Sequence, residues 1–447
     1  MQRIFDFLRS DDIPYVARAT YLQERAHLII WSLVLGTIEA NLAGVVVTKT
    51  FHASKLLTTV VWGLPVVMMM LNVLWGLIIR GRPRKLVLFI LTIVAALLTG
   101  SIAFATPEWH PWGGWVFAGQ IGLIHFFVSG LVTLRSSMWQ VNYPESIRGR
   151  IIGRIQTIRF LFVPLSAAVV SAQFDLDPSH YCIVYPAVAG LGLLSLVPMR
   201  RFRVRRERSE IKEYRAHRVK LRESGGASTG LWGGVKEAGG ILRRHHEFRR
   251  YMLAQFSLGS ANFFTDPMLL VVITMRLDFD YLTSIMVMAV IPGMCSWLAI
   301  RFWAPYFDKV GVVRFRVANC YVWISSYICV AAAMLIIESG ASEYFGLAIG
   351  IIVAGRVLKG VAHGGGIIAW SIGHLHFARK NQVDLYMSIH VAFTGVRALT
   401  MPYLSLLANT LLGNSSFLIA IGLSGTATYL FRKLASGDAG GETEPRA

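Results

Sequence analysis

Charged residues are scarce in this sequence. Asp, Glu, Lys and Arg make up only 15% of its 447 residues, whereas 54% are hydrophobic. Soluble globular domains carry about 25% charged residues, because their surfaces face water. The composition therefore excludes an ordinary soluble domain and predicts an integral membrane protein.

Motifs typical of several enzyme and metal-site classes are also missing. The four cysteines have neither CxxC nor Cys–His spacing, so no zinc site or disulfide framework is predicted. His374 and His376 stand in an HLH triplet without a third nearby ligand. The sequence contains no P-loop, GxSxG or HExxH motif. We therefore expect no enzymatic activity, no cofactor, no metal ion and no ATP-driven transport.

Negative charge is scarcer than positive charge. The chain has 44 Lys and Arg against 25 Asp and Glu, a formal net charge of +19. In a soluble protein this balance would suggest a nucleic-acid partner, but in a membrane protein basic residues are retained on the cytoplasmic face. We therefore expect the lipid bilayer as a partner, no nucleic acid, and a monomer.

Long apolar runs are abundant. A membrane-spanning helix needs about 20 apolar residues. Such runs lie near 28–48, 56–79, 86–105, 115–138, 150–172, 181–199, 251–275, 283–303, 317–337, 344–371, 387–408 and 415–431. The sequence thus predicts an all-α membrane protein with twelve transmembrane helices in two six-helix bundles. The predicted domains are an N-terminal bundle (1–199), a basic linker with interfacial helices (200–249), a C-terminal bundle (250–434) and a disordered tail (435–447).

Basic residues alternate between successive connections. Lys and Arg are frequent at residues 80–85, in the basic linker, at residues 308–316 and at residues 377–380. The intervening connections contain only Lys49, Lys55 and Arg276 as basic residues. Because basic loops stay in the cytoplasm, this pattern predicts that both termini and the linker are cytoplasmic.

The fifth and eleventh apolar runs share a short sequence pattern. Residues 156–165 read QTIRFLFVPL and residues 394–404 read TGVRALTMPYL. Arg159 is followed five residues later by Pro164, and Arg397 by Pro402. The match falls at the same ordinal helix of each half, which predicts two pseudo-symmetric bundles.

Two halves of six spans joined by a long cytoplasmic linker resemble the major facilitator superfamily of secondary transporters. That family carries a Gly-x-x-x-Asp-x-x-Gly-Arg-Lys motif after its second helix and a degenerate copy after its eighth. The segment beginning at Ala304 resembles the degenerate copy, with Asp308, Gly311 and the basic Arg314. We assign these motif residues gating or structural roles.

The first copy of this motif is weaker. It keeps Gly76, Arg84 and Lys85 but has Arg80 in place of the Asp and Pro83 in place of the second Gly. The resemblance implies a divergent bacterial branch located in the inner membrane. It also implies transport of a small-molecule solute by alternating access, with Pro164 and Pro402 in structural or gating positions.

Two acidic residues lie inside predicted spans, where a charge costs about 2.5–3.5 kcal/mol to insert. Glu39, with Asn41 two residues later, lies in the first span, and Asp266, followed by Pro267, lies in the seventh. Each carboxylate could couple transport to protons. Glu39 could equally be the structural partner of an arginine, and Asp266 could cap a helix segment at a local break. We expect Asn41 to contact the solute.

Arg159 and Arg397 lie roughly eight to ten residues inside their spans, too deep for the guanidinium to reach the interface easily. In the family resembled, helices five and eleven flank the central cavity. The resemblance therefore implies that these two residues clamp a carboxylate or phosphate of the solute. Alternatively, each pairs with a carboxylate such as Glu39 within its own bundle.

The tenth span carries three polar residues at helical spacing. Arg356, Lys359 and His363 lie on one face, which should meet water or acidic partners. We expect the first two to contact the solute and His363 to take part in proton coupling. His125 in the fourth span is either a proton relay or a hydrogen-bonded core residue.

These observations together predict a secondary transporter that is coupled to protons and carries an anionic or polar organic solute. Two alternatives remain open at this stage. The protein could export amphipathic compounds or lipids, or it could be a non-transporting membrane scaffold or receptor. The weak motif at 76–85 favours the last alternative.

Overall fold

The fold was examined in a computed structural model that describes residues 10, 13–79, 81–209, 211–213, 216, 239–378 and 383–439. Arg80, most of the predicted interfacial helices of the linker and the end of the predicted tail lie outside these residues. The chain divides into two compact units. The first comprises residues 1–228 and 277–285, and the second comprises residues 229–276 and 286–447.

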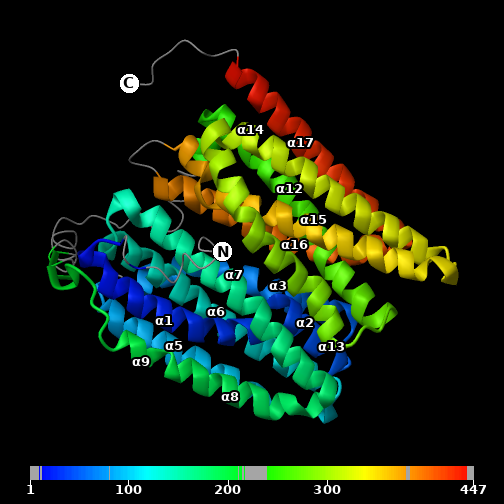
Figure 1. The fold of residues 1–447 in the computed structure, drawn as a ribbon, viewed down its shortest axis with the longest axis horizontal. Helices are drawn as coiled ribbons and strands as arrows, with labels where there is room; N and C mark the ends of the chain where they lie inside the picture. The colour runs from blue at the N-terminus through cyan, green and yellow to red at the C-terminus, as the bar shows by residue number, and fades with distance from the viewer. Residues whose placement is uncertain are drawn as a thin grey trace. The chain divides into compact units, whose positions relative to one another are not determined.

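The first unit is built from helices, which Figure 1 shows in blue to green. They are α1 (Tyr15–Ile38), α2 (Ala40–Lys49), α3 (Lys55–Met69), α4 (Asn72–Ile79), α5 (Arg84–Ser101), α6 (Trp112–Asn142), α7 (Glu145–Leu176), α8 (Tyr181–Leu194), α9 (Leu196–Met199) and the short α13 (Tyr281–Ile285). Helix α1 packs against α7 and α8, and α5 packs against α6 and α8. The helix α13 contacts α2 and α7, so it extends the first unit although it follows the seventh predicted span.

The described part of the second unit is also built from long helices (Figure 1). They are α12 (His246–Val271), α14 (Ile291–Glu338), α15 (Phe345–Ile372), α16 (Val383–Leu412) and α17 (Leu418–Ala439). Two π-helical turns, Val272–Arg276 and Met286–Val290, follow α12 and precede α14. Helix α12 packs against α16 and α17, and α14 packs against α15. The buried Leu434 belongs to the core, which explains why α17 continues into the predicted tail.

Helix is present at each predicted span, but the number of separate spans differs from twelve. By length and composition, eight helical stretches of the described chain could cross a membrane, or nine if the bent pair α1–α2 is one span. Two of these stretches, Tyr281–Glu338 and Ile389–Ser436, each contain two predicted spans. Helix α14 turns at Gly311, whose φ of 73° lies in the left-handed region that glycine adopts readily.

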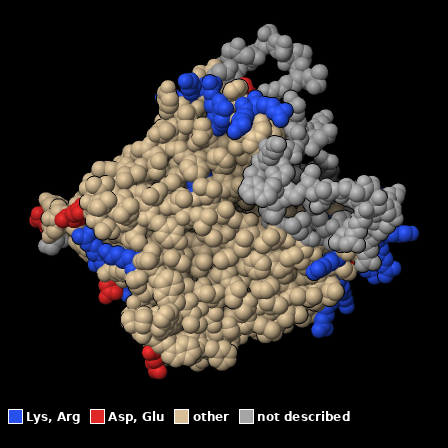
Figure 2. All heavy atoms as spheres, turned by 180° about the vertical axis from the view of Figure 1, so that it is seen from behind, with Lys and Arg blue, Asp and Glu red and all other residues tan. Residues whose placement is uncertain are grey.

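The surface agrees with a multi-pass membrane protein. Large apolar side chains are exposed on several helices, among them Leu97 on α5, Val169 on α7 and Leu347 on α15. On the face shown in Figure 2, charged side chains lie at the margins and almost none interrupt a wide uncharged area. Such an area would be costly in water but is stable against lipid.

Candidate functional site

The first helix of the first unit is broken at Glu39. This residue has φ −59° and ψ 144°, outside the helical region, and α1 and α2 are bent by 40°. A helix end leaves its last carbonyl groups without intrahelical partners. Here His125 Nε2 lies 2.8 Å from the Ile38 oxygen, and the Tyr185 hydroxyl donates to the Thr37 oxygen at 3.4 Å. Side chains of α6 and α8 therefore stabilise the break.

The hydrogen bond of His125 fixes which nitrogen of its ring carries the hydrogen. Because a carbonyl oxygen can only accept, Nε2 must carry the hydrogen. His125 is buried, and the structure places it as a hydrogen-bonded core residue, the second of the two roles considered for it. No geometry described here tests its role in proton coupling.

Glu39 and Arg159 belong to the same unit, and their charges attract each other. Both side chains are half-buried. Asn41 accepts a hydrogen bond from Trp62 Nε1 at 3.2 Å, so this amide is already held by α3. Among the described residues no ion pair joins Glu39 to Arg159, so their pairing inside the first bundle and contact of either group with a solute both stay predictions.

A buried cluster of charged groups lies in the second unit. Asp266 Oδ1 accepts a hydrogen bond from Arg356 Nη1 at 2.9 Å, and Asp266 Oδ2 accepts one from Lys359 Nζ. The side chains of Arg356, Asp266 and Lys359 are 1%, 8% and 12% exposed. The polar face predicted on the tenth span therefore meets an acidic partner.

Two expectations for this region are wrong. Asp266 does not cap a helix, because α12 continues beyond it to Val271. Pro267 does not break the helix either. Ser405 of α16 donates a hydrogen bond to the Phe264 oxygen at 2.6 Å, and such bonds from neighbouring helices allow proline inside a membrane helix.

Arg356 is held on three sides. Besides Asp266, its Nε donates to the Val287 oxygen at 3.0 Å and its Nη2 donates to the Met288 oxygen at 2.8 Å. Both carbonyls belong to the π-helical turn before α14. Lys359, one turn along α15, has Asp266 as its only described hydrogen-bond partner. The cluster thus combines a fixed guanidinium with an ammonium group that depends on one carboxylate.

His363 lies one turn beyond Lys359 on α15. Its Nδ1 is 3.3 Å from the Ser296 hydroxyl of α14. The glycines that follow allow these two helices to approach closely, since a Cβ at Gly364 would lie 2.7 Å from the Ser296 oxygen and one at Gly365 would lie 2.8 Å from the Trp303 ring. These glycines therefore serve the close packing of α14 and α15.

Arg397 is buried, with 3% exposure. Its Nη1 donates to the Gln255 oxygen at 2.6 Å and its Nη2 donates to Thr394 Oγ1 at 2.7 Å. The guanidinium occupies space that a side chain at Gly259 would need, because a Cβ there would lie 1.8 Å from Nη1. Among the described residues no carboxylate contacts Arg397. Its donors are thus used largely within the bundle.

Arg159 and Arg397 occupy equivalent positions. Arg159 lies in α7 and Arg397 in α16, and each is followed five residues later by a proline of the same helix. Pro164 and Pro402 lie inside the same two helices. The structure thus agrees with the internal repeat inferred from the sequence.

The motif residues lie away from these buried charges. Asp308 and Arg314 are exposed near the turn at Gly311. Gly76 lies in α4. The Arg84 backbone N–H donates to Glu207 Oε1, and Lys85 Nζ donates to the Arg200 oxygen, each at 2.6 Å.

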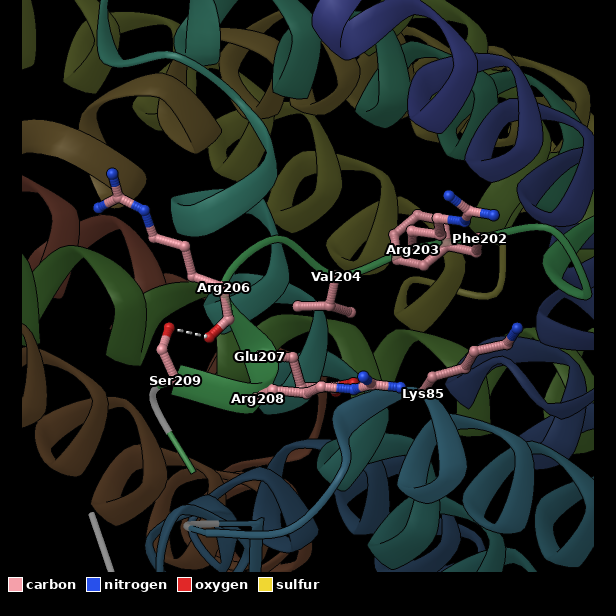
Figure 3. A pocket seen from close by; sticks show the side chains of 8 residues that line it. All are labelled: Lys85, Phe202, Arg203, Val204, Arg206, Glu207, Arg208 and Ser209. Atoms are coloured by element: carbon pink, nitrogen blue, oxygen red, sulfur yellow. Dashed lines mark hydrogen bonds between the residues drawn. The ribbon is translucent and has the colours of Figure 1, made fainter. Parts of the chain in front are cut away.

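A pocket of about 590 Å³ borders this basic end of the first motif copy (Figure 3). Its lining residues are Lys85, Phe202, Arg203, Val204, Arg206, Glu207, Arg208 and Ser209. The guanidinium groups here are on exposed residues and are solvated. The pocket therefore lacks the buried charges of the two clusters described above.

Sequence reasoning missed Glu24. This carboxylate is buried with 2% exposure and accepts hydrogen bonds from the Tyr143 hydroxyl at 2.6 Å and from Trp139 Nε1. The charged N-terminal stretch was predicted to precede the first span, but helix α1 already begins at Tyr15. Apolar spacing within that stretch, which includes the buried Ala17 and Tyr21, could have revealed the longer helix.

Comparison with solved structures identifies the fold. A D-xylose–proton symporter matches with a TM-score of 0.62 and 13% identity over 93% of this chain and 98% of that chain. The inward-open xylose transporter XylE from E. coli matches with a TM-score of 0.64 and 14% identity, over 91% and 95%. A POT family transporter in complex with a thioalcohol-conjugated peptide matches with a TM-score of 0.65 and 13% identity, over 93% and 96%. No protein-family description and no curated protein matches the sequence. The chain therefore has the fold of major facilitator superfamily transporters.

Proposed function

We propose that this protein is a secondary transporter that moves a small anionic or polar organic solute by alternating access, coupled to protons. The observation that carries the proposal is the buried cluster of Asp266, Arg356 and Lys359. Ionisable groups inside a membrane are costly and mark solute or proton pathways. Solved proteins of this fold include a proton symporter of xylose and a peptide-bound transporter, which supports transport as the activity.

The contacts of the cluster suggest how a proton would act. When Asp266 is ionised, it holds both cations. Protonation of the carboxyl removes the charge that Lys359 depends on, whereas Arg356 keeps the Val287 and Met288 carbonyls. Lys359 is then the group released to bind an anionic or polar part of the solute. In this scheme His363, one turn further along α15, accepts or returns the proton.

In the first unit, the helix break at Glu39 supports a second coupling group. Broken helices are tolerated in a membrane where they line a cavity, and transporters bind substrates at such breaks. We assign Arg159 and Asn41 to solute contact beside this break, with His125 holding the broken end. We also assign Arg397 to solute contact, but with fewer free donors, because Nη1 and Nη2 are already bonded within its bundle.

We also propose that the protein is a monomer of the bacterial inner membrane with both termini in the cytoplasm. The alternation of basic and non-basic connections in the sequence supports this orientation. Cysteine accessibility in intact cells and in inverted vesicles would test it. Labelling of a cysteine placed at exposed Arg301 and of one placed at exposed Glu343 should show opposite sidedness.

Transport in proteoliposomes tests the proposed function. Labelled sugars, nucleosides, peptides and organic acids would be offered with and without an imposed pH gradient. For a transported solute, Asp266→Asn should abolish accumulation driven by the gradient but retain exchange between labelled and unlabelled solute. Glu343→Gln, a change at an exposed acidic residue, is the matched control. Arg159→Gln should raise the half-saturating solute concentration.

The outcomes separate the alternatives. Flux driven by a solute gradient but never by a pH gradient would refute proton coupling and retain transport. Flux of amphipathic compounds or lipids alone would support the exporter alternative. Absence of flux for every solute class would refute transport and favour a scaffold or receptor.

A further inference from the structure

A second group of buried cations lies in the second unit, apart from the Asp266 cluster. Arg316 of α14 and Arg397 of α16 are 2% and 3% exposed. Two histidines, His374 and His390, are buried beside them at 4% and 1% exposure. Their rings are stacked with centroids 6.2 Å apart. His390 interacts electrostatically with both arginines and with His374, and the two arginines repel each other.

Much of the hydrogen-bonding capacity of this group is unused. Arg316 donates to the Tyr251 hydroxyl, but its Nε and Nη2 are buried and have no partner among the described residues. Both ring nitrogens of His390, Nδ1 of His374 and Nε of Arg397 are also buried without partners. Buried donors are almost always satisfied. These atoms therefore point to a missing acceptor.

The described residues around the group supply no compensating negative charge. The members of the group lie on α14, the 3-10 turn Gly373–His376 and α16, and no described carboxylate forms an ion pair with either arginine. Because arginine stays protonated in proteins, two positive charges are buried together. Such charges are strongly unfavourable unless they are paired. An anion among them would remove this cost.

We propose that Arg316, Arg397, His374 and His390 bind a phosphate group inside the second unit. The several oxygens of a phosphate group can accept from donors on three different elements, and a free phosphate ion or monoester also carries two charges to match the two guanidiniums. A planar carboxylate offers only two oxygens and one charge. Arginine recognises phosphate in the same way in many proteins. The site shares Arg397 with the proposed solute contacts, but its other members lie outside the Asp266 and Glu39 clusters.

The position of the site indicates the side of the membrane from which phosphate would reach it. Arg316 lies five residues past the turn at Gly311, and Tyr251 lies in the second turn of α12. His374 follows α15 directly, and His390 lies in the first part of α16. All four mark the same end of the unit, which is cytoplasmic in the orientation proposed above. The phosphate could belong to a soluble ion or ester, or to the headgroup of an anionic lipid.

Thermal unfolding of the purified protein in an uncharged detergent tests the proposal. Inorganic phosphate should raise the Tm saturably, whereas potassium chloride of matched ionic strength should not. Arg316→Gln should raise the Tm without phosphate, because it removes an uncompensated charge. The same variant should weaken phosphate binding by about tenfold or more, the effect of losing a charged hydrogen bond. Arg301→Gln, an exposed arginine on the same helix α14, should leave both quantities unchanged.

The same unfolding experiment is repeated with short-chain phosphatidylglycerol as the ligand and phosphatidylcholine as its control. A response to phosphatidylglycerol alone assigns the same site to a lipid headgroup, and a response to inorganic phosphate assigns it to a soluble ligand. His390→Gln provides an independent variant should Arg316→Gln fail to fold. Wild-type protein that responds to neither ligand would overturn the proposal. So would variants that respond as strongly as the wild type, or an Arg316→Gln protein that folds but is less stable than wild type without phosphate.

Discussion

Replacing Asp266 by asparagine should destabilise the second unit strongly. The change keeps the shape of the side chain but removes the charge that pairs with Arg356 and Lys359 at a site where all three groups are at least 88% buried. Two charge-assisted hydrogen bonds are weakened, each with a net contribution of about 1.5–3 kcal/mol. Removing one partner of a buried ion pair costs about 3–5 kcal/mol in measured cases. We expect a loss within that range.

The contacts predict which cation causes most of this loss. Arg356 retains two backbone carbonyls, whereas Lys359 is left with an unpaired buried charge. Adding Lys359→Met to the asparagine variant should therefore recover about 1.5–3 kcal/mol, although the same substitution destabilises the wild type. A double-mutant cycle measured by unfolding in mixed micelles of dodecyl maltoside and SDS gives the coupling directly.

Two results would refute this reasoning. A change below about 0.5 kcal/mol for the asparagine variant is what exposed positions show, and it would mean that the carboxylate is not buried with its partners. Additive effects of the two substitutions would mean that Asp266 and Lys359 do not interact.

Three further changes test other parts of the structure. Gly259→Ala should cost about 1–3 kcal/mol, because its Cβ would lie 1.8 Å from Arg397 Nη1. His125→Ala should cost about 1–3 kcal/mol, because it leaves the buried Ile38 carbonyl without its donor. For Asp278, the lysine at the end of α2 lowers the carboxyl pKa through a 2.8 Å ion pair. The pair should contribute above the unfolded pKa of about 3.9 and be lost as the pH falls through the lower folded value.

Each of these changes has a matched control in the chain. Gly119→Ala meets nothing within 4 Å of its new Cβ and should be neutral or stabilising. His125→Gln keeps an N–H donor and should retain more stability than the alanine variant. For the ion pair, the unfolding midpoint between pH 3 and pH 6 would be compared with that of Asp278→Asn, whose profile should lack this component. Equal losses for a variant and its control would contradict the proposed cause.

The sequence predicted the helical architecture well because apolar length and the distribution of basic residues are local signals. It also predicted that the face with Arg356 and Lys359 meets either water or an acidic partner, since helical spacing alone puts the two cations together. It could not identify Asp266 as that partner, because the pairing joins helices about ninety residues apart in the chain. Only the tertiary structure, which brings the Asp266 carboxylate of α12 to the two cations of α15, decides it.

The break in the first helix shows a second limit of prediction from the sequence. Proline is the usual local signal for a break, and this favoured Pro267, yet α12 continues through that position. The real break at Glu39 has no adjacent proline and depends on His125 and Tyr185 from other helices. Arg316 was assigned to a basic connection because residues 308–316 are rich in Lys and Arg, which is again a local signal. Its burial follows from the turn at Gly311, which directs the rest of α14 back into the bundle.

The π-helical turn at Met286–Val290 gives the Asp266 cluster a geometric property of its own. Its hydrogen bonds run to the fifth residue rather than the fourth, so this turn holds one more residue than an α-helical turn. An α-helix advances by about 100° and 1.5 Å per residue. Were this turn to tighten to α-helical form, everything after it in α14 would rotate by about that angle relative to what precedes it. Arg356 holds two of its carbonyls in place, and thereby the rotational register of the part of α14 that precedes the turn at Gly311.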